Sequence, residues 1–354
     1  MPSRAARPNA NIEPGGSGEG GDYSTLTPSL VLDALDAVGL RGDGRILQLN
    51  SYENRVFQVF LEDGTAVVAK FYRPGRWSAA QILEEHRFAL ELAEAEVPVV
   101  PPLLLSTPLG PSSVDLLGVP ATLARHHDSH GTHRFAVAAR CAGREPELDD
   151  PDTLRQIGRF IGRLHAVGRR RPFEHRHRMQ ARVDGPLAVK LLVDGGFVAD
   201  DQRATWESAC RQALALVDKG FSAVPTLRAL RLHGDCHPGN VLWRDGAPHV
   251  VDLDDACTGP AVQDLWMLVS GDASSMQRQL ALLLDGYTQF SDFDERELRL
   301  IEPLRTLRMV RHSAWLAARW NDPTFPLNFP FFGSSAYWSQ QTTQLREQVE
   351  AMTL

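Results

Sequence analysis

Cysteine is scarce in this sequence, and its few copies show no pairing along the chain. Cys141, Cys210, Cys236 and Cys257 are scattered over 354 residues, with no Cys-x-x-Cys spacing. A chain of this length can bury a sizeable core without disulfides, and a structural zinc site normally uses closely spaced thiols and imidazoles. We therefore expect four reduced thiols in a cytoplasmic protein.

Long apolar runs and an excess of positive charge are also missing. No stretch of about 18 consecutive apolar residues occurs, and the N-terminus lacks the apolar segment of a signal peptide. The formal net charge is -7, whereas a general nucleic-acid binder normally carries a basic excess. We predict that the protein neither spans a membrane nor binds nucleic acid, and that it is a monomer.

The most informative stretch is a polar loop between two short apolar runs. The loop contains Asp235 and, five residues later, Asn240, and Asp252 stands at the end of the next apolar run. Phosphoryl transfer from ATP needs a carboxylate that orients and deprotonates the attacking hydroxyl, and oxygen ligands that hold Mg²⁺ on the phosphates. The sequence therefore predicts Asp235 as the catalytic base and Asn240 and Asp252 as the Mg²⁺ ligands.

The Asp-x-x-x-x-Asn spacing resembles the catalytic loop of protein kinases, with Asp252 at the position of the first residue of the D-F-G motif. Gly234 in place of the kinase arginine resembles the aminoglycoside phosphotransferase branch of the kinase-like fold. A turn aspartate or a capping asparagine would explain any one of these residues alone. Those readings do not explain the ordered series His233-Gly234-Asp235, Pro238-Gly239-Asn240, Asp252-x-Asp254 and Gln263-Asp264-Leu265.

Lysine is nearly absent, which draws attention to the copies that remain. Only Lys70, Lys190 and Lys219 are lysines among 37 basic residues. A retained lysine in an arginine-rich chain suggests a position that needs a compact ammonium group. Lys70 ends the run Val67-Val68-Ala69-Lys70, which resembles the kinase V-A-I-K element whose lysine binds the α- and β-phosphates.

Glycine is missing from the turn at residues 50–55, where a kinase-like lobe would cover the phosphates, and no P-loop motif occurs. We predict that the Ser51 hydroxyl contacts phosphate there, with an ordinary turn as an equal alternative. Glu84 and Glu85 lie in a predicted helix over residues 79–95. Only one of them can face Lys70, because adjacent helical residues point about 100° apart. We prefer Glu85, since Glu85-His86 resembles the family pattern.

The pattern of elements predicts an α+β, bilobal, protein-kinase-like fold. Residues 1–22 are rich in Pro, Gly and Ser and predict a disordered tail. Alternating apolar residues over 45–72 predict an antiparallel meander in an N-lobe over residues 23–140. Helical spacing dominates a C-lobe over residues 141–354, in which Arg305, Arg308 and Arg311 recur at three-residue intervals and could line a substrate groove.

From about residue 25 to residue 341 the chain resembles the stress response kinases, the YihE/RdoA-type bacterial Ser/Thr protein kinases of the aminoglycoside phosphotransferase-like superfamily. The resemblance implies ATP and Mg²⁺, phosphorylation of protein Ser/Thr and a role in stress response. It is carried by residues 49–56, 70–74, 82–86, 230–237, 251–256 and 259–266.

Spacing alone indicates only a hydroxyl phosphotransferase, so two alternatives stay open. One is a small-molecule kinase acting on an aminoglycoside, choline or an amino-alcohol. The other is an ATP-binding pseudokinase scaffold, which is disfavoured because Lys70, Asp235, Asn240 and Asp252 are all present.

Overall fold

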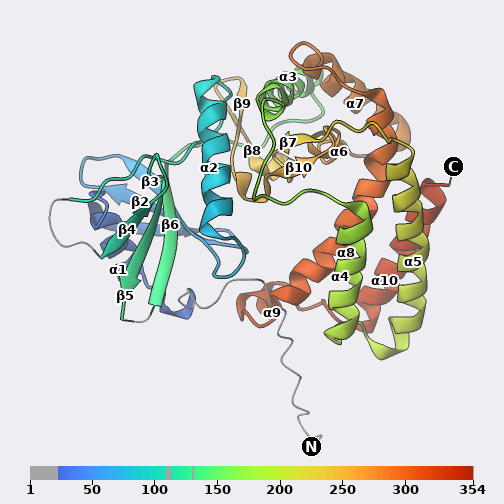
Figure 1. Cartoon of the computed structure of the whole chain (residues 1–354), viewed down its shortest axis with the longest axis horizontal. Helices are drawn as coiled ribbons and strands as arrows, with labels where there is room; N and C mark the ends of the chain where they lie inside the picture. Colours follow the sequence, from blue (N-terminus) through green and yellow to red (C-terminus); the bar gives the residue numbers. More distant parts are fainter. Residues whose placement is uncertain (1–22, 109–112, 130, 354) are drawn as a thin grey trace, which may run out of the picture.

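The computed structural model describes residues 23–108, 113–129 and 131–353. The tail predicted to be disordered, residues 1–22, lies outside these ranges. The structure has a sheet lobe and a helical lobe, with helix α2 (Ala79–Glu94) standing between them (Figure 1). This architecture confirms the predicted bilobal α+β fold. None of the described helices is long and apolar enough to cross a membrane.

The sheet lobe contains six antiparallel strands in the order β1-β2-β3-β6-β5-β4. Alternating apolar residues bury one face, where Phe57, Phe71 and Phe135 pack against helix α1 (Pro28–Asp36) and its neighbours. Lys70 lies on β3, the strand between β2 and β6, so both of its neighbours fix its backbone. The strands are β1 (Gly42–Leu49), β2 (Arg55–Leu61), β3 (Ala66–Phe71), β4 (Val114–Leu117), β5 (Leu123–Asp128) and β6 (Gly131–Ala139).

Two short antiparallel ribbons carry the polar loop of the helical lobe. β7 (Leu230–Leu232) pairs with β10 (Cys257–Gly259), and β8 (Val241–Arg244) pairs with β9 (Ala247–Val250). The turn between β8 and β9 has positive φ at both Asp245 and Gly246, as a type I′ hairpin requires. Two short 3₁₀ turns flank the second ribbon along the chain: η2 (Pro238–Asn240) directly precedes β8, and η3 (Leu253–Asp255) lies between β9 and β10.

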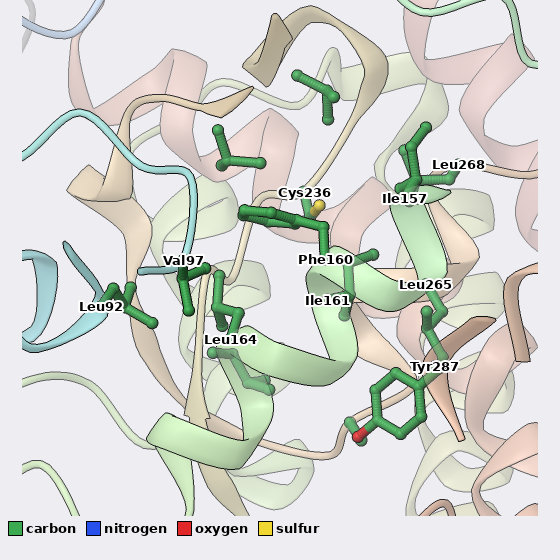
Figure 2. Packing of buried hydrophobic residues seen from close by; sticks show 14 of the residues in the cluster. Leu92, Val97, Ile157, Phe160, Ile161, Leu164, Cys236, Leu265, Leu268 and Tyr287 are labelled. Carbon is green, nitrogen blue, oxygen red and sulfur yellow. The ribbon is translucent and has the colours of Figure 1, made fainter. Parts of the chain in front are cut away.

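The helical lobe packs around a core that also anchors the polar loop. Figure 2 shows Cys236 of this loop beside Phe160, within a buried cluster that includes Ile157 and Leu265. Gly158 lets α3 (Pro151–Gly168) approach α7 (Ala273–Tyr287) closely, because a Cβ there would stand 2.0 Å from the carbonyl oxygen of Leu283. The helices are α3 (Pro151–Gly168), α4 (Ala181–Asp194), α5 (Asp200–Ser222), α6 (Gln263–Trp266), α7 (Ala273–Tyr287), α8 (Ile301–Ala318), α9 (Thr324–Asn328) and α10 (Ser335–Ala351).

Candidate active site

The turn that presents Asp235 depends on the glycine before it. Gly234 has φ +87°, and a Cβ at this position would lie 2.2 Å from the carbonyl oxygen of Asp255. A side chain would therefore collide with the backbone as well as strain the left-handed conformation. This explains physically why glycine, rather than arginine, stands between His233 and Asp235.

Asp264 of α6 holds this turn from below. Its carboxylate accepts the backbone N–H groups of His233 and Gly234, both at 2.8 Å, and Nε2 of buried His165 at 3.0 Å. Burial would raise the pKa of Asp264, but the hydrogen bond and charge of His165 lower it, so the carboxylate stays ionised. The structure thus gives Asp264 a bracing contact with the loop and places His165 in the core behind it.

The Asp235 carboxylate faces α8. Its Oδ1 accepts Arg308 Nη1 at 2.5 Å, and His237 Nε2 lies 3.6 Å from Oδ2. The Asp235 side chain is 23% exposed, and an incoming hydroxyl meets the Arg308 guanidinium beside it. The sequence had singled out Arg308 for its spacing, but not for this contact.

Asn240 and Asp252 lie at the open end of the β8–β9 hairpin. Val241 pairs with Val250, which places Asn240 opposite Val251 and next to Asp252. Asn240 Nδ2 donates to the carbonyl oxygen of Asp235 at 2.9 Å, and this bond ties the amide to the polar loop. The hairpin register therefore brings both predicted metal ligands to one edge.

Lys70 reaches this edge from the sheet lobe. Its Nζ donates to Asp252 Oδ1 at 2.7 Å and lies 4.0 Å from Asp254 Oδ1. Desolvation would lower the pKa of Lys70, but the charges of Asp252 and Asp254 raise it well above its usual value. Desolvation would raise the pKa of Asp252, but the Lys70 ammonium lowers it. Both groups are therefore charged at neutral pH.

The ion pair expected between Glu85 and Lys70 is not formed in this structure. Among the described residues, the carboxylates within 4.0 Å of Lys70 Nζ are those of Asp252 and Asp254. Glu85 is buried, its Oε2 has no hydrogen-bond partner within the described part of the chain, and burial raises its pKa to about 7. The role of Glu85 with nucleotide bound stays a prediction.

Glu84, the alternative partner, is committed elsewhere. Its carboxylate accepts three successive backbone N–H groups, those of Glu174, His175 and Arg176, at 2.6–2.8 Å. Arg176 in turn donates Nε to the carbonyl oxygen of Ala256 at 2.8 Å. Glu84 thus fastens α2 to residues 174–176, and this segment contacts the chain just after η3.

The raised pKa of Glu85 predicts a pH-dependent difference in stability. Its folded pKa of about 7 exceeds the ordinary 4.5, so the folded state binds more protons and loses stability as pH rises between these values. We expect wild type to lose stability relative to Glu85→Gln between pH 5 and pH 8, measured by urea denaturation. Buried His86, whose pKa falls to about 3, has the opposite slope but is common to both proteins. A constant difference between the two proteins would contradict the assignment.

The glycine-free loop at residues 50–55 is held by side chains rather than left flexible. Asn54 donates Nδ2 to Asp254 Oδ2 at 3.0 Å and accepts the backbone N–H of Arg73 at 3.1 Å. Ser51 Oγ accepts the backbone N–H of Asn54 at 3.3 Å. Because Oγ is the acceptor in that bond, its own O–H remains able to donate to a phosphate.

We expect Ser51→Ala to lower kcat/KM for ATP by roughly one to two orders of magnitude, as loss of a hydrogen bond to a charged group does. Steady-state kinetics with varied ATP measure this. Ser51→Gly is the control, since it removes the hydroxyl but restores backbone freedom. A fully active Gly variant beside an impaired Ala variant would show that flexibility, not a side-chain contact, is what the loop needs.

A group of charged side chains ties this loop to the end of α8. Glu53 Oε2 accepts Arg319 Nε at 2.6 Å, and Glu53 Oε1 lies 3.1 Å from Arg73 Nε. Asp322 Oδ2 accepts Arg73 Nη2 at 2.9 Å and Arg55 Nη2 at 3.3 Å. These five side chains link the sheet lobe to the helical lobe beside the expected phosphate site.

The residues at the hairpin edge fit a hard divalent cation. Asn240 and Asp252 supply amide and carboxylate oxygens, which Mg²⁺ prefers beside phosphate oxygens and water. Asp254 Oδ1 is buried without a hydrogen-bond partner among the described residues, so it offers a further negative oxygen there. The sequence showed Asp254 only as part of Asp-x-Asp; its contacts with Asn54 and Arg76 Nη1 were not foreseen.

The fold and this arrangement define a kinase-like phosphotransferase, in which the sheet supplies a lysine and the helical lobe supplies carboxylates and an amide. Residues 45–301 match the phosphotransferase enzyme family, and the chain belongs to this family. Membership implies that the protein uses ATP.

Curated relatives cover almost the whole chain. Stress response kinase A of Escherichia coli (strain K12) is 43% identical over 330 residues, 93% of this chain and 94% of that protein. The serine/threonine protein kinase RdoA of Salmonella typhimurium (strain LT2) is 42% identical over the same shares. The resemblance to stress response kinases stated from the motifs is therefore confirmed.

Solved structures with the same fold are more distant. Amicoumacin kinase hAmiN, in complex with AMP-PNP and Ca²⁺, has a TM-score of 0.68 at 18% identity, over 94% of this chain and 95% of that one. A microcompartment-associated aminopropanol kinase has a TM-score of 0.68 at 15% identity, over 92% and 98%. At these identities the likeness shows the fold alone.

Proposed function

We propose that this protein transfers the γ-phosphoryl group of ATP to a Ser or Thr hydroxyl of a protein acceptor, within a stress response. The observation that carries the proposal is the 42% identity to the serine/threonine protein kinase RdoA across 93% of the chain. In this proposal residues 23–140 bind the nucleotide, and residues 141–354 carry the catalytic loop and the acceptor surface.

The roles of the side chains follow from where they stand. Lys70 and Ser51 bind ATP phosphates, with Lys70 leaving Asp252 as the nucleotide enters. Asn240 and Asp252 hold Mg²⁺, which neutralises charge on the phosphates when bound. Asp235 orients the acceptor hydroxyl and takes its proton. The bond from the hydroxyl oxygen to the γ-phosphorus forms as the β–γ bridging bond breaks, and ADP leaves.

A small hydroxyl compound is the second candidate acceptor, because the kinases named for amicoumacin and aminopropanol share this fold. The two candidates separate in one assay. The chain is incubated with Mg²⁺ and γ-labelled ATP, either with protein acceptors or with a panel of aminoglycosides, choline and amino-alcohols. Label in Ser or Thr of a protein supports the proposal. Label only in a small alcohol would overturn it in favour of the second candidate.

A further inference from the structure

The catalytic carboxylate is covered by a positive charge from the acceptor side. Arg308 Nη1 donates to Asp235 Oδ1 at 2.5 Å, and the Arg308 side chain is 46% exposed. An arginine that is half in solvent and also bonded to the expected base stands where an acceptor must approach. It belongs to α8, outside the loops predicted to hold ATP and metal, so an acceptor that reaches Asp235 meets its charge.

Arg311 adds a second exposed positive charge to this part of α8, and two imidazoles lie nearby. Arg311 lies one turn further along α8 and is exposed. Burial would raise the pKa of Asp184, but the hydrogen bond from His177 and, further, the charge of Arg311 lower it. His237 Nε2 lies 3.6 Å from Asp235. Burial and then the charge of Arg308 lower the pKa of His312, so this imidazole adds no charge at neutral pH.

The neighbouring carboxylates are already paired within the protein. Asp255 Oδ1 accepts Arg76 Nη2 at 2.6 Å, and Asp184 Oδ2 lies 3.2 Å from His177 Nε2. Asp252 is bound to Lys70. Arg308, the cation that contacts Asp235, therefore presents a partly exposed positive charge beside this carboxylate, although the whole chain has a net charge of -7.

We propose that Arg308 is a specificity residue that selects acceptors with a negative charge beside the hydroxyl, which for a protein substrate means Ser or Thr in an acidic segment. The inference rests on the proposed phosphotransfer at Asp235 and names its substrate class. An acidic group on the acceptor draws the guanidinium away from Asp235 and frees the carboxylate for the hydroxyl. An ammonium acceptor of the choline or amino-alcohol kind is repelled by Arg308 instead.

The test compares two peptides that share a central Ser and differ only in flanking Glu or Lys residues. We expect wild type to show a kcat/KM about two- to fivefold higher for the Glu peptide, as one partly exposed ion pair provides. Arg308→Gln should bring the ratio towards one, and Arg308→Glu should invert it. Arg296→Glu reverses an exposed charge that pairs with Asp294 and should leave the wild-type ratio unchanged.

The same design separates this inference from the proposed function. If neither peptide is labelled but a small alcohol is, protein kinase activity is wrong, and 4-hydroxybutyrate is compared with 4-aminobutanol in the same four proteins. A preference for the anionic member that Arg308→Glu inverts still supports the inference. A ratio near one in wild type, or a ratio that Arg308→Glu leaves unchanged, overturns it for either kind of acceptor.

Discussion

Asp235→Asn should lower kcat by about 10² or more while leaving ATP affinity nearly unchanged, because a positioned base acts in the transition state and not in nucleotide binding. The Asn side chain keeps the size of Asp235, and the turn itself is fixed by Gly234 and Asp264. Single-turnover kinetics measure the chemical step, and calorimetry measures ATP binding.

Asp285→Asn is a suitable control for this variant. Asp285 is exposed on α7 and pairs with Arg155, away from the loop. Near-normal turnover in Asp235→Asn would contradict the assignment of Asp235 as the catalytic base. A parallel loss of ATP binding would instead indicate that Asp235 shapes the nucleotide site.

Replacing Asp252 should have the second large effect. We expect Asp252→Asn to reduce activity by 10² or more and to weaken binding of Mg·ATP far more than binding of adenosine, because a charged oxygen ligand is lost from the metal. Titration calorimetry with Mg·ATP and with adenosine measures the difference.

Asn is the sharper substitution here because of the backbone. Asp252 has φ 62° and ψ 64°, a left-handed conformation that Asn tolerates and that Ala adopts at a cost of about 1–2 kcal/mol. Asp252→Ala, which loses both charge and backbone preference, serves as the comparison. If Asn is active and only Ala is impaired, Asp252 supports the turn rather than the metal.

The parts of the site that could be predicted involve residues that are close together in the sequence. Asp235, Asn240 and Asp252 are joined by a tight turn and one hairpin, so their spacing already implied that they meet. The meander carrying Lys70 followed from residue alternation, because the side chains of a strand alternate between faces. Local patterns of this kind identify both the fold class and the residues that share an edge.

What could not be predicted depends on partners far apart in the chain. Glu53 and Arg319 are separated by 266 positions, and no periodicity marks either residue for the other. The same holds for Arg308 and Asp235, 73 positions apart. Helix α4 was also not foreseen, since Gly185-Pro186 lies inside it and reads locally as a break. Packing against α5 and α8 stabilises a helix that the local sequence does not predict.

The attachment of α2 bears on how such an enzyme is controlled. Three backbone N–H groups converge on Glu84, and Gln81 Nε2 adds a bond to the carbonyl oxygen of His175 at 3.0 Å. We infer that these bonds keep α2 in place beside Lys70 in the nucleotide-free protein. We expect no millisecond exchange of α2 amides in relaxation-dispersion spectra of the nucleotide-free protein, and observed exchange would contradict this inference. If α2 stays in place, the rate of phosphoryl transfer depends on how much of the protein is present and on how much acceptor it meets.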